Sequence, residues 1–217
     1  MIISQDMPKL ESPFVRKLIN GEYVVTPEIN PGYEWVFDDP TVLAIEKLHG
    51  TNVSIIIENG QISSIWNRTE RIPFFCKGKR FILEGLLEAH ERGYTELPDG
   101  QWFGELIGPK VNGNPYQLEK HLWIPFATQA RDHLAYKSWG KYPKTFESIS
   151  GWFQTLMPLF GYKTHGKEKV EKESEKYGFV EGVVFTHPDG RMAKLRKDMF
   201  PWFKGRRHND GFGEGSG

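Results

Sequence analysis

Apolar and polar residues in the first half of the chain follow a pattern typical of β-strands. Positions 41–46 and 53–58 are filled mainly by β-branched and apolar residues, as expected of strands that are largely buried. The second run ends at Asn59 and Gly60, the dipeptide favoured in two-residue type I′ turns, and a further strand is expected over 61–67. The pattern therefore predicts a hairpin that closely follows another strand.

Helical spacing of apolar residues appears in two segments. One helix is expected from Lys79 to Arg92, with Gly93 ending it. A second helix is expected after Thr145, a good N-cap residue, and before Gly161. The apolar stripe of this second helix consists of Phe146, Ile149, Phe153, Leu156 and Phe160.

The remaining segments favour strands over helices. Strands are expected at 102–107 and 121–128, and a second hairpin is expected from 179–185 and 191–196. Residues 166–177 alternate Lys and Glu, which indicates an exposed helix or a mobile segment. Because strands dominate without a regular strand–helix–strand alternation, the pattern predicts an α+β domain built on antiparallel sheets.

Length and composition narrow the class of protein. A chain of 217 residues fits one domain, or one domain with a small appendage. Its single cysteine, Cys76, excludes an internal disulfide and a Cys-rich zinc site, and we expect a packed thiol. No apolar run approaches the ~20 residues of a membrane span, and the first residues do not resemble a secretory signal. These features predict a cytoplasmic protein.

Charge is balanced over the whole chain but not along it. Lys plus Arg number 28, as do Asp plus Glu, so there is no overall bias toward nucleic acid. Basic residues nevertheless gather in two segments, which could be solvated faces or contacts for an RNA backbone. These two basic clusters are Arg68, Arg71, Lys77, Lys79 and Arg80, and Arg191, Lys194, Arg196, Lys197, Lys204, Arg206 and Arg207.

Lys47 is the strongest candidate for covalent chemistry. It follows the strand at 41–46 and shares a loop with His49, Gly50 and Asn52. A lysine acts as a nucleophile when burial or neighbouring cations lower its pKa. Lys194 and Arg196 lie two apart on a strand, so they face the same side. They could lower the pKa of a nearby lysine or bind phosphate oxygens. The other histidines have no metal-ligand spacing and are expected to be structural or exposed.

The segment from Glu46 to Asn52, EKLHGTN, resembles the nucleotidyl-transfer motif of covalent nucleotidyltransferases. His after Lys marks the version found in RNA ligases of the bacteriophage double-strand-sealing and kinetoplastid RNA-editing type. Further motifs of this family follow in order over residues 41–200, and together they are far more specific than any one of them. They are Arg68, Phe103–Pro109, Trp123–Phe126, Glu181–Phe185 and Lys194–Arg196.

This resemblance implies a fold and an activity. The fold would be an antiparallel-sheet nucleotidyltransferase domain, the ATP-grasp-like adenylation domain of ligases, over residues 1–207. The Gly-rich residues 208–217 would form a disordered tail, with no separate C-terminal domain. The activity would be that of an ATP-dependent RNA ligase, which joins 3′-hydroxyl and 5′-phosphate RNA ends through a lysyl-AMP and an adenylylated RNA.

The resemblance also implies roles for the residues around the nucleophile. Lys47 would attack the α-phosphorus of ATP. His49 and Asn52 would orient phosphate oxygens or metal-bound water, and Lys194 with Arg196 would neutralise charge on the α-phosphate as pyrophosphate leaves.

Other positions would bind the rest of the nucleotide. Glu46 would receive the adenine amino group, and Phe126 would stack on adenine, with Trp123 as a rival for that role. Glu105 would accept from a ribose hydroxyl. Further roles would belong to Arg68, which would contact the ribose or the incoming phosphate, and Glu181, which would hold Mg²⁺, with Mn²⁺ as an alternative, or the waters of the metal ion.

Two departures from the family pattern leave alternatives open. Arg196 stands where Lys is common, unless Lys197 takes that role, and Ala127 stands where Asp is common. A DNA ligase or a GTP-using capping-type transferase is the nearest alternative enzyme, although His49 argues against both. A nucleotide- or RNA-binding module without catalysis is a third alternative. RNA ends are the expected substrate, whether nicked duplex, tRNA or single strands, and an accessory partner stays open.

Overall fold

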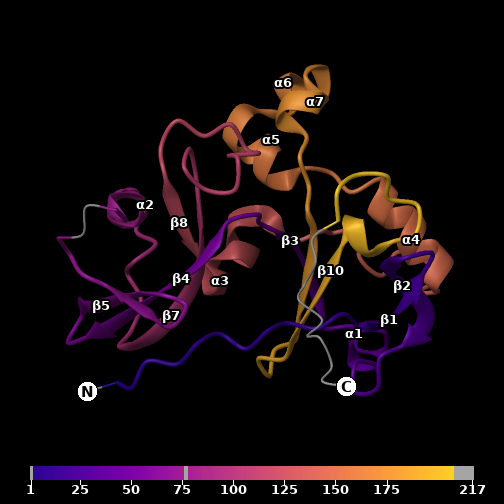
Figure 1. Cartoon of the computed structure of the whole chain (residues 1–217), viewed down its shortest axis with the longest axis horizontal. Helices are drawn as coiled ribbons and strands as arrows, with labels where there is room; N and C mark the ends of the chain where they lie inside the picture. Colours follow the sequence, from indigo (N-terminus) through magenta and orange to yellow (C-terminus); the bar gives the residue numbers. More distant parts are fainter. Residues whose placement is uncertain (1, 76–77, 208–217) are drawn as a thin grey trace.

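Antiparallel sheets carry the strands of this chain, as seen in the computed structural model (Figure 1), which describes residues 2–75 and 78–207. Within these residues the strands form a two-stranded, a three-stranded and a five-stranded sheet. In sheet order they are β1 (Phe14–Ile19) and β2 (Glu22–Ile29); β10 (Met192–Arg196), β9 (Gly182–Thr186) and β3 (Leu43–Lys47); and β6 (Glu70–Ile72), β5 (Gln61–Asn67), β4 (Thr51–Glu58), β7 (Gly100–Ile107) and β8 (Leu122–Pro125). The α+β class with antiparallel sheets is therefore confirmed.

Helices are short and lie outside the sheets (Figure 1). A π-helical turn at Ala130–Leu134 and a 3₁₀ turn at Lys197–Met199 each continue directly from another element. The α-helices are α1 (Trp35–Asp38), α2 (Arg80–Glu91), α3 (Phe126–Gln129), α4 (Phe146–Gln154), α5 (Leu159–His165), α6 (Lys167–Lys172) and α7 (Ser174–Tyr177).

The predicted hairpins form because their turns are encoded locally. Asn59 and Gly60 have φ of 54° and 73°, the positive values that a type I′ turn requires, and β4 pairs with β5 across them. The hairpin of β9 and β10 is also confirmed. The hairpin of β1 and β2 is not among the predictions, although Asn20 and Gly21 carry the same turn signal and have φ of 53° and 81°.

Two predicted boundaries are wrong. The strand expected over 121–128 ends at Pro125, where the chain turns into α3 and the hydroxyl of Thr128 donates to the carbonyl of Pro125 at 3.0 Å. The helix expected as far as Gly161 is interrupted: α4 begins after Thr145 as predicted, but it ends at Gln154, and Gly161 lies inside α5. Pro158 explains the interruption, since proline has no N–H for a helix interior.

The other helical expectations are confirmed. The helix expected at 79–92 is α2, followed by Gly93 at a φ of 73°. Residues 166–177 form α6 and α7, whose polar sequence is anchored by the buried Val170 and Tyr177. No helix in the described part of the chain is long and apolar enough to cross a membrane. Cys76 and the tail at 208–217 lie outside the described residues, and the domain boundary at 207 stays a prediction.

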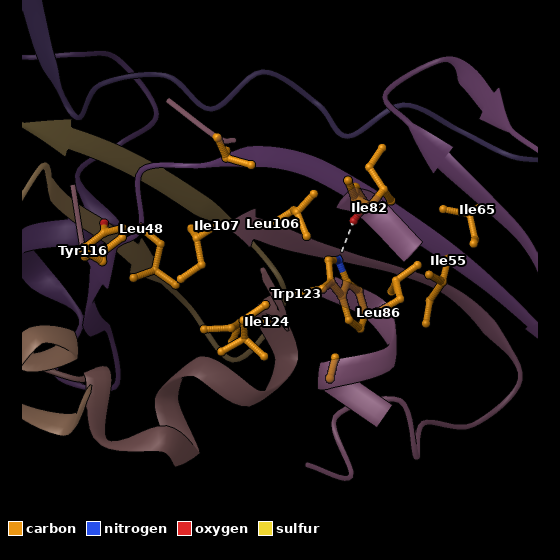
Figure 2. Packing of buried hydrophobic residues seen from close by; sticks show 14 of the residues in the cluster. Leu48, Ile55, Ile65, Ile82, Leu86, Leu106, Ile107, Tyr116, Trp123 and Ile124 are labelled. Carbon is orange, nitrogen blue, oxygen red and sulfur yellow. Dashed lines mark hydrogen bonds between the residues drawn. The ribbon is translucent and has the colours of Figure 1, made fainter. Parts of the chain in front are cut away.

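Apolar side chains form two clusters, one on each large sheet. Figure 2 shows the cluster of the five-stranded sheet, where α2 contributes Ile82 and Leu86. Trp123 is fully buried there, and its indole N–H donates to the carbonyl of Val53 at 2.9 Å. Trp123 is therefore a core residue, and its expected rivalry with Phe126 for stacking on adenine does not fit this position.

The two large sheets are connected at the sequence that carries the candidate nucleophile. β3 belongs to the three-stranded sheet and ends at Lys47, and β4 of the five-stranded sheet begins at Thr51. Only residues 48–50 separate them. This short crossing fixes Lys47 at the junction of the two sheets.

Candidate active site

A cavity of about 420 Å³ lies between the two large sheets. One wall comes from the three-stranded sheet, a second from the five-stranded sheet and α3, and a third from residues 6–10, which we call the N-terminal strap. The first wall includes Ile45, Lys47, Val184, Thr186, Met192 and Lys194; the second includes Thr51, Asn52, Arg68, Glu105, Phe126 and Gln129.

Strand alternation explains why Lys47 faces this cavity. Side chains on a strand point alternately to opposite faces, so Ile45 and Lys47 share one face of β3. Ile45 is paired with Val184 of β9, which is in turn paired with Lys194 of β10. Paired residues share a face, so the register brings the amines of Lys47 and Lys194 to the same side of the sheet.

Lys47 is held by the carboxylate of Glu181, the residue immediately before β9. Its Nζ lies 2.8 Å from Glu181 Oε2 and 3.2 Å from the carbonyl oxygen of Leu48. Nδ1 of His49 lies 3.3 Å from the same Glu181 oxygen. Burial works to raise the pKa of Glu181, but the Lys47 ammonium and His49 outweigh it and hold that pKa below its usual value. The candidate nucleophile therefore sits against an ionised carboxylate.

Gly50 brings a second carboxylate close to this loop. A side chain at this position would collide with the carbonyl of Leu106 and with Glu105, so only glycine allows the close approach. The Gly50 N–H donates to Glu105 Oε1 at 2.8 Å. Burial raises the pKa of Glu105 to about 7, although the nearby Lys47 ammonium lowers it in part. Asn52 pairs with Glu105 across β4 and β7, so both belong to the same wall.

Tyr116 supports the loop from beneath. Its hydroxyl accepts from the His49 N–H at 2.7 Å, and its side chain is 2% exposed. The ring meets Phe160 and Phe179 edge-on, and its carbonyl lies 2.7 Å from Nε2 of His165. The backbone between Lys47 and Gly50 is thus fixed by a buried residue that belongs to none of the recognised motifs.

The structure brings most of the sequence-predicted residues together. The cavity is lined by Lys47, Asn52, Arg68, Glu105, Phe126 and Lys194, and His49 and Glu181 contact one another at the amine of Lys47. Phe126 is half-buried at the start of α3. Arg68 is exposed, with Nε 3.8 Å from Asp6 of the N-terminal strap.

Glu46 is placed differently from the expectation. It lies on the opposite face of β3 from Lys47, fully buried, and its Oε2 accepts from the Phe160 N–H at 2.8 Å. Burial raises the pKa of Glu46 to about 8, although hydrogen bonds from Phe160 and Leu159 and the nearby Lys197 oppose the rise. This placement contradicts the expected contact with adenine. Glu46 instead connects β3 to the first turn of α5.

Arg196 is not among the residues that line the cavity. It shares a face with Lys194, as predicted, but its side chain is 5% exposed and its Nε donates to Asp198 at 2.8 Å. Lys197 does not line the cavity either; it lies close enough to Glu46 to affect that residue's pKa. The Nε of Arg196 is therefore paired with Asp198, and the expected contact of Arg196 with an α-phosphate stays a prediction. Lys194 is the cavity residue of this motif.

Met7, Lys9 and Gln129 are among the residues that line the cavity but that sequence reasoning missed. Met7 Sδ lies 3.3 Å from the amide nitrogen of Asn52, and no sequence pattern marks the strap that carries it. Gln129 follows Phe126 by three positions, which places the two on one face of a helix. The interpretation of 121–128 as a strand concealed that signal.

The side chains at the cavity supply oxygen donors but no dedicated metal cage. Among the described residues, no three His, Cys, Asp or Glu side chains gather closely enough to hold a metal ion. Glu105 and Glu181 lie near enough for each to affect the charge of the other. One or two carboxylates completed by phosphate oxygens are typical of Mg²⁺, so the donor set fits a metal that arrives with a nucleotide.

Comparisons with solved structures find similar proteins at low sequence identity. A search of curated proteins finds no match. Among solved structures, an apo variant of Naegleria gruberi RNA ligase is 13% identical, with a TM-score of 0.41 over 88% of this chain and 62% of that chain. A variant of the same ligase with ATP and Mn is 14% identical, with a TM-score of 0.43 over 86% of this chain and 59% of that chain. The chain thus spans about three fifths of these proteins.

The family itself is identified from the sequence. The model of the RNA ligase family matches residues 40–205. This range covers most of the chain and contains every motif residue from Glu46 to Arg196. The chain belongs to the RNA ligase family.

Proposed function

We propose that this chain is an ATP-dependent RNA ligase that uses Lys47 as its nucleophile. One observation carries the proposal: six sequence motifs, separated by as much as 150 residues, converge on one cavity in which Lys47 contacts Glu181. If the Lys47–Glu181 ion pair were only structural, the cavity would not need an aromatic ring for stacking, a carboxylate for a ribose hydroxyl or further cations beside it. A site for a nucleoside triphosphate needs each of these groups.

The reaction divides one phosphoryl transfer into easier steps. Lys47 Nζ attacks the α-phosphorus of ATP, and the bond to pyrophosphate breaks as a phosphoramidate to AMP forms. An oxygen of an RNA 5′-phosphate then attacks the same phosphorus and releases the lysine. Finally a 3′-hydroxyl attacks the RNA phosphate, AMP leaves and a phosphodiester results. The proton that Lys47 must lose first has Glu181 Oε2 as an acceptor at 2.8 Å.

Each remaining cavity residue has a role in this proposal. Phe126 stacks on the adenine ring, and Glu105 accepts from a ribose hydroxyl. Asn52 Oδ1, which is buried with no hydrogen-bond partner among the described residues, accepts from a hydroxyl or a metal-bound water. Lys194 and Arg68 bind phosphate oxygens, because cations that are already in place stabilise the charge that develops on them.

A divalent metal ion belongs to the same proposal. Glu181, with Glu105 nearby, would hold the ion or its waters, and phosphate oxygens would supply the other ligands. The metal would neutralise charge on the departing pyrophosphate. Mg²⁺ is the expected ion, and Mn²⁺ has the same preference for oxygen in such a site.

A covalent adduct is the decisive test. Purified protein, first shown by intact mass to be free of AMP, is incubated with Mg²⁺ and α-labelled ATP or GTP and then denatured. We expect label from ATP on Lys47, located by peptide mapping. Lys47→Arg is the sharpest variant, because it keeps the cation beside Glu181 but has no nucleophilic amine at neutral pH. Lys141→Arg, at an exposed position, is the matched control.

The outcomes separate the alternative functions. Label from ATP that is lost in Lys47→Arg and kept in Lys141→Arg supports the proposal, and sealing of nicked RNA but not nicked DNA completes it. An adduct from GTP instead would indicate a capping-type transferase. ATP binding without any adduct would contradict the proposal and favour a binding module.

A further inference from the structure

Two buried polar atoms in the wall of the cavity have no hydrogen-bond partner among the described residues: Asn52 Oδ1 and Gln129 Nε2. Gln129 is only 4% exposed. A buried amide nitrogen without a partner costs about 1–3 kcal/mol, and native proteins contain few such groups. Gln129 belongs to none of the motifs that the proposed function uses. Its unpaired donor therefore calls for a ligand group in the cavity.

The position of Gln129 relative to Phe126 indicates which part of a ligand it meets. The two residues are the last and first of α3, three positions apart, so their side chains leave the same face of the helix. Both line the cavity. If a flat base stacks on the ring of Phe126, the side chain of Gln129 is expected to meet an edge of that base rather than its face.

The backbone around Gln129 is fixed to the strand that carries Lys47. The π-helical turn at Ala130–Leu134 follows Gln129 directly, and such turns occur often at functional sites. Beyond this turn, Ala135 bridges to Ile45 and the Tyr136 N–H donates to the carbonyl of Ala44 at 2.8 Å. A residue held at both ends by secondary structure can select a ligand by geometry, which a mobile loop residue does less well.

We infer that Gln129 reads the edge of the purine and selects adenine over guanine, an inference that rests on the proposed use of ATP. Its amide nitrogen donates to a ring nitrogen, and its amide oxygen accepts from the 6-amino group. A carboxamide matches this pair of groups on adenine. On the same edge guanine offers two acceptors, the ring nitrogen and the 6-oxo group, so the amide oxygen would face another acceptor. A site built around such a bond rejects the mismatched base.

The test compares nucleotides that differ only at the base edge. The rate of lysyl-AMP-type adduct formation, as kcat/KM, is measured with ATP, with GTP and with purine riboside triphosphate, which lacks the 6-amino group. The variants are Gln129→Met, which has similar volume but no amide, and Gln129→Glu, which replaces the donating nitrogen by oxygen. Gln154→Met, at an exposed position near the end of α4, is the matched control.

We expect Gln129→Met to lower kcat/KM for ATP by about tenfold to a hundredfold, the range of one good bidentate contact to a base. Its preference for ATP over purine riboside triphosphate should fall toward one, whereas Gln154→Met should keep the wild-type preference. Gln129→Glu should also lose activity with ATP. A purely structural role would lower all three nucleotides equally, and an unchanged preference in Gln129→Met would overturn the inference.

Binding separates this inference from the proposed catalysis. In a Lys47→Ala background, calorimetric titration with ATP and purine riboside triphosphate reports base selection without any adduct. Loss of the preference on adding Gln129→Met supports base reading even if the wild-type protein forms no adduct. An unchanged ratio of the two dissociation constants contradicts it even if ligation is demonstrated. Thermal melting of each variant identifies any that fails to fold.

Discussion

At the scale of single residues, the site depends on buried polar groups that hold the loop of Lys47 in place. The hydroxyl of Tyr116 is the partner of the His49 N–H, and Glu105 is the partner of the Gly50 N–H. These two bonds fix the backbone on either side of His49. Small displacements of a nucleophile lower the rate of an in-line attack strongly, so the supporting residues should matter nearly as much as the reacting ones.

Tyr116→Phe tests this support. The change removes one oxygen and leaves the His49 N–H without its partner, which should destabilise the fold by about 1–3 kcal/mol. Lysyl-AMP formation should slow by about tenfold, mainly in kcat, because the loop is displaced. Single-turnover rates at saturating ATP and urea unfolding measure the two effects.

Tyr142→Phe is the matched control for Tyr116→Phe. The hydroxyl of Tyr142 is buried with no partner among the described residues, so its removal should leave the rate unchanged and the stability equal or slightly higher. Equal effects of the two variants on the rate would contradict a positioning role for Tyr116.

Glu46 gives a prediction for the dependence of stability on pH. Burial raises its pKa in the folded chain to about 8, above the ordinary value of 4.5. Between these values the folded state binds more protons than the unfolded state, so the free energy of unfolding falls as pH rises. The contribution is complete below pH 4.5 and is lost as pH passes about 8. Urea unfolding between pH 5 and 9 is expected to show this decline.

Glu46→Gln separates this residue from the other titrating groups. Glutamine can still accept from the Phe160 N–H but carries no charge, so the variant should lose less stability than the wild-type protein as pH rises. Glu105 contributes a decline of the same sign, since burial raises its pKa to about 7. The control variant is Glu175→Gln, at an exposed position, which should show the same pH dependence of stability as the wild-type protein. If Glu46→Gln also shows the wild-type pH dependence, the raised pKa of Glu46 is excluded as its cause.

At the scale of elements, the N-terminal strap is the least conventional part of the site. Amide groups of Gln101 exchange hydrogen bonds with the backbone of Gln5 at 2.9 and 2.8 Å, and the Lys194 N–H donates to the carbonyl of Glu11 at 2.9 Å. The strap is therefore attached to the five-stranded sheet at one end and to β10 at the other. Between these attachments it forms a wall of the cavity.

Lys9→Ala tests whether the strap takes part in binding ATP. Lys9 lines the cavity with Lys47, Arg68 and Lys194, so its removal takes one cation from the surroundings of the polyphosphate. We expect KM for ATP to rise about three- to tenfold with little change in stability, because exposed lysines contribute little to folding. Lys17→Ala, whose ion pair with Glu28 lies on the surface, is the control. An unchanged KM would exclude the strap from nucleotide binding.

Elements differ in how well the sequence predicts them, for physical reasons. Hairpins follow from short turn signals, Asn59–Gly60 for β4–β5 and the Pro–Asp–Gly turn at 188–190 for β9–β10, and the turn at Asn20 and Gly21 could have revealed β1–β2. Apolar runs are ambiguous between strand and helix, which is why α3 was missed. Among the site residues, Lys47 and Phe126 were predictable from motifs. The burial of Glu46 depends on Phe160, a partner far away in the sequence that no local pattern contains.

At the scale of the whole molecule, the described chain has two apolar clusters, one on each large sheet, with a cavity between the two sheets. Three residues, 48–50, make the direct covalent crossing from β3 to β4. The groups that would bind a nucleotide are therefore divided between walls that belong to two apolar clusters, and Leu159 packs against both clusters.

This division has a consequence for how the two parts melt. A ligand that binds only the intact cavity stabilises the state in which both walls are folded. Joined to Lys47 on one side and stacked on Phe126 on the other, an adenylate would act as a non-peptide cross-link between the two clusters. The two halves would then lose their structure together rather than one after the other, so a bound adenylate would make the unfolding of the protein more cooperative.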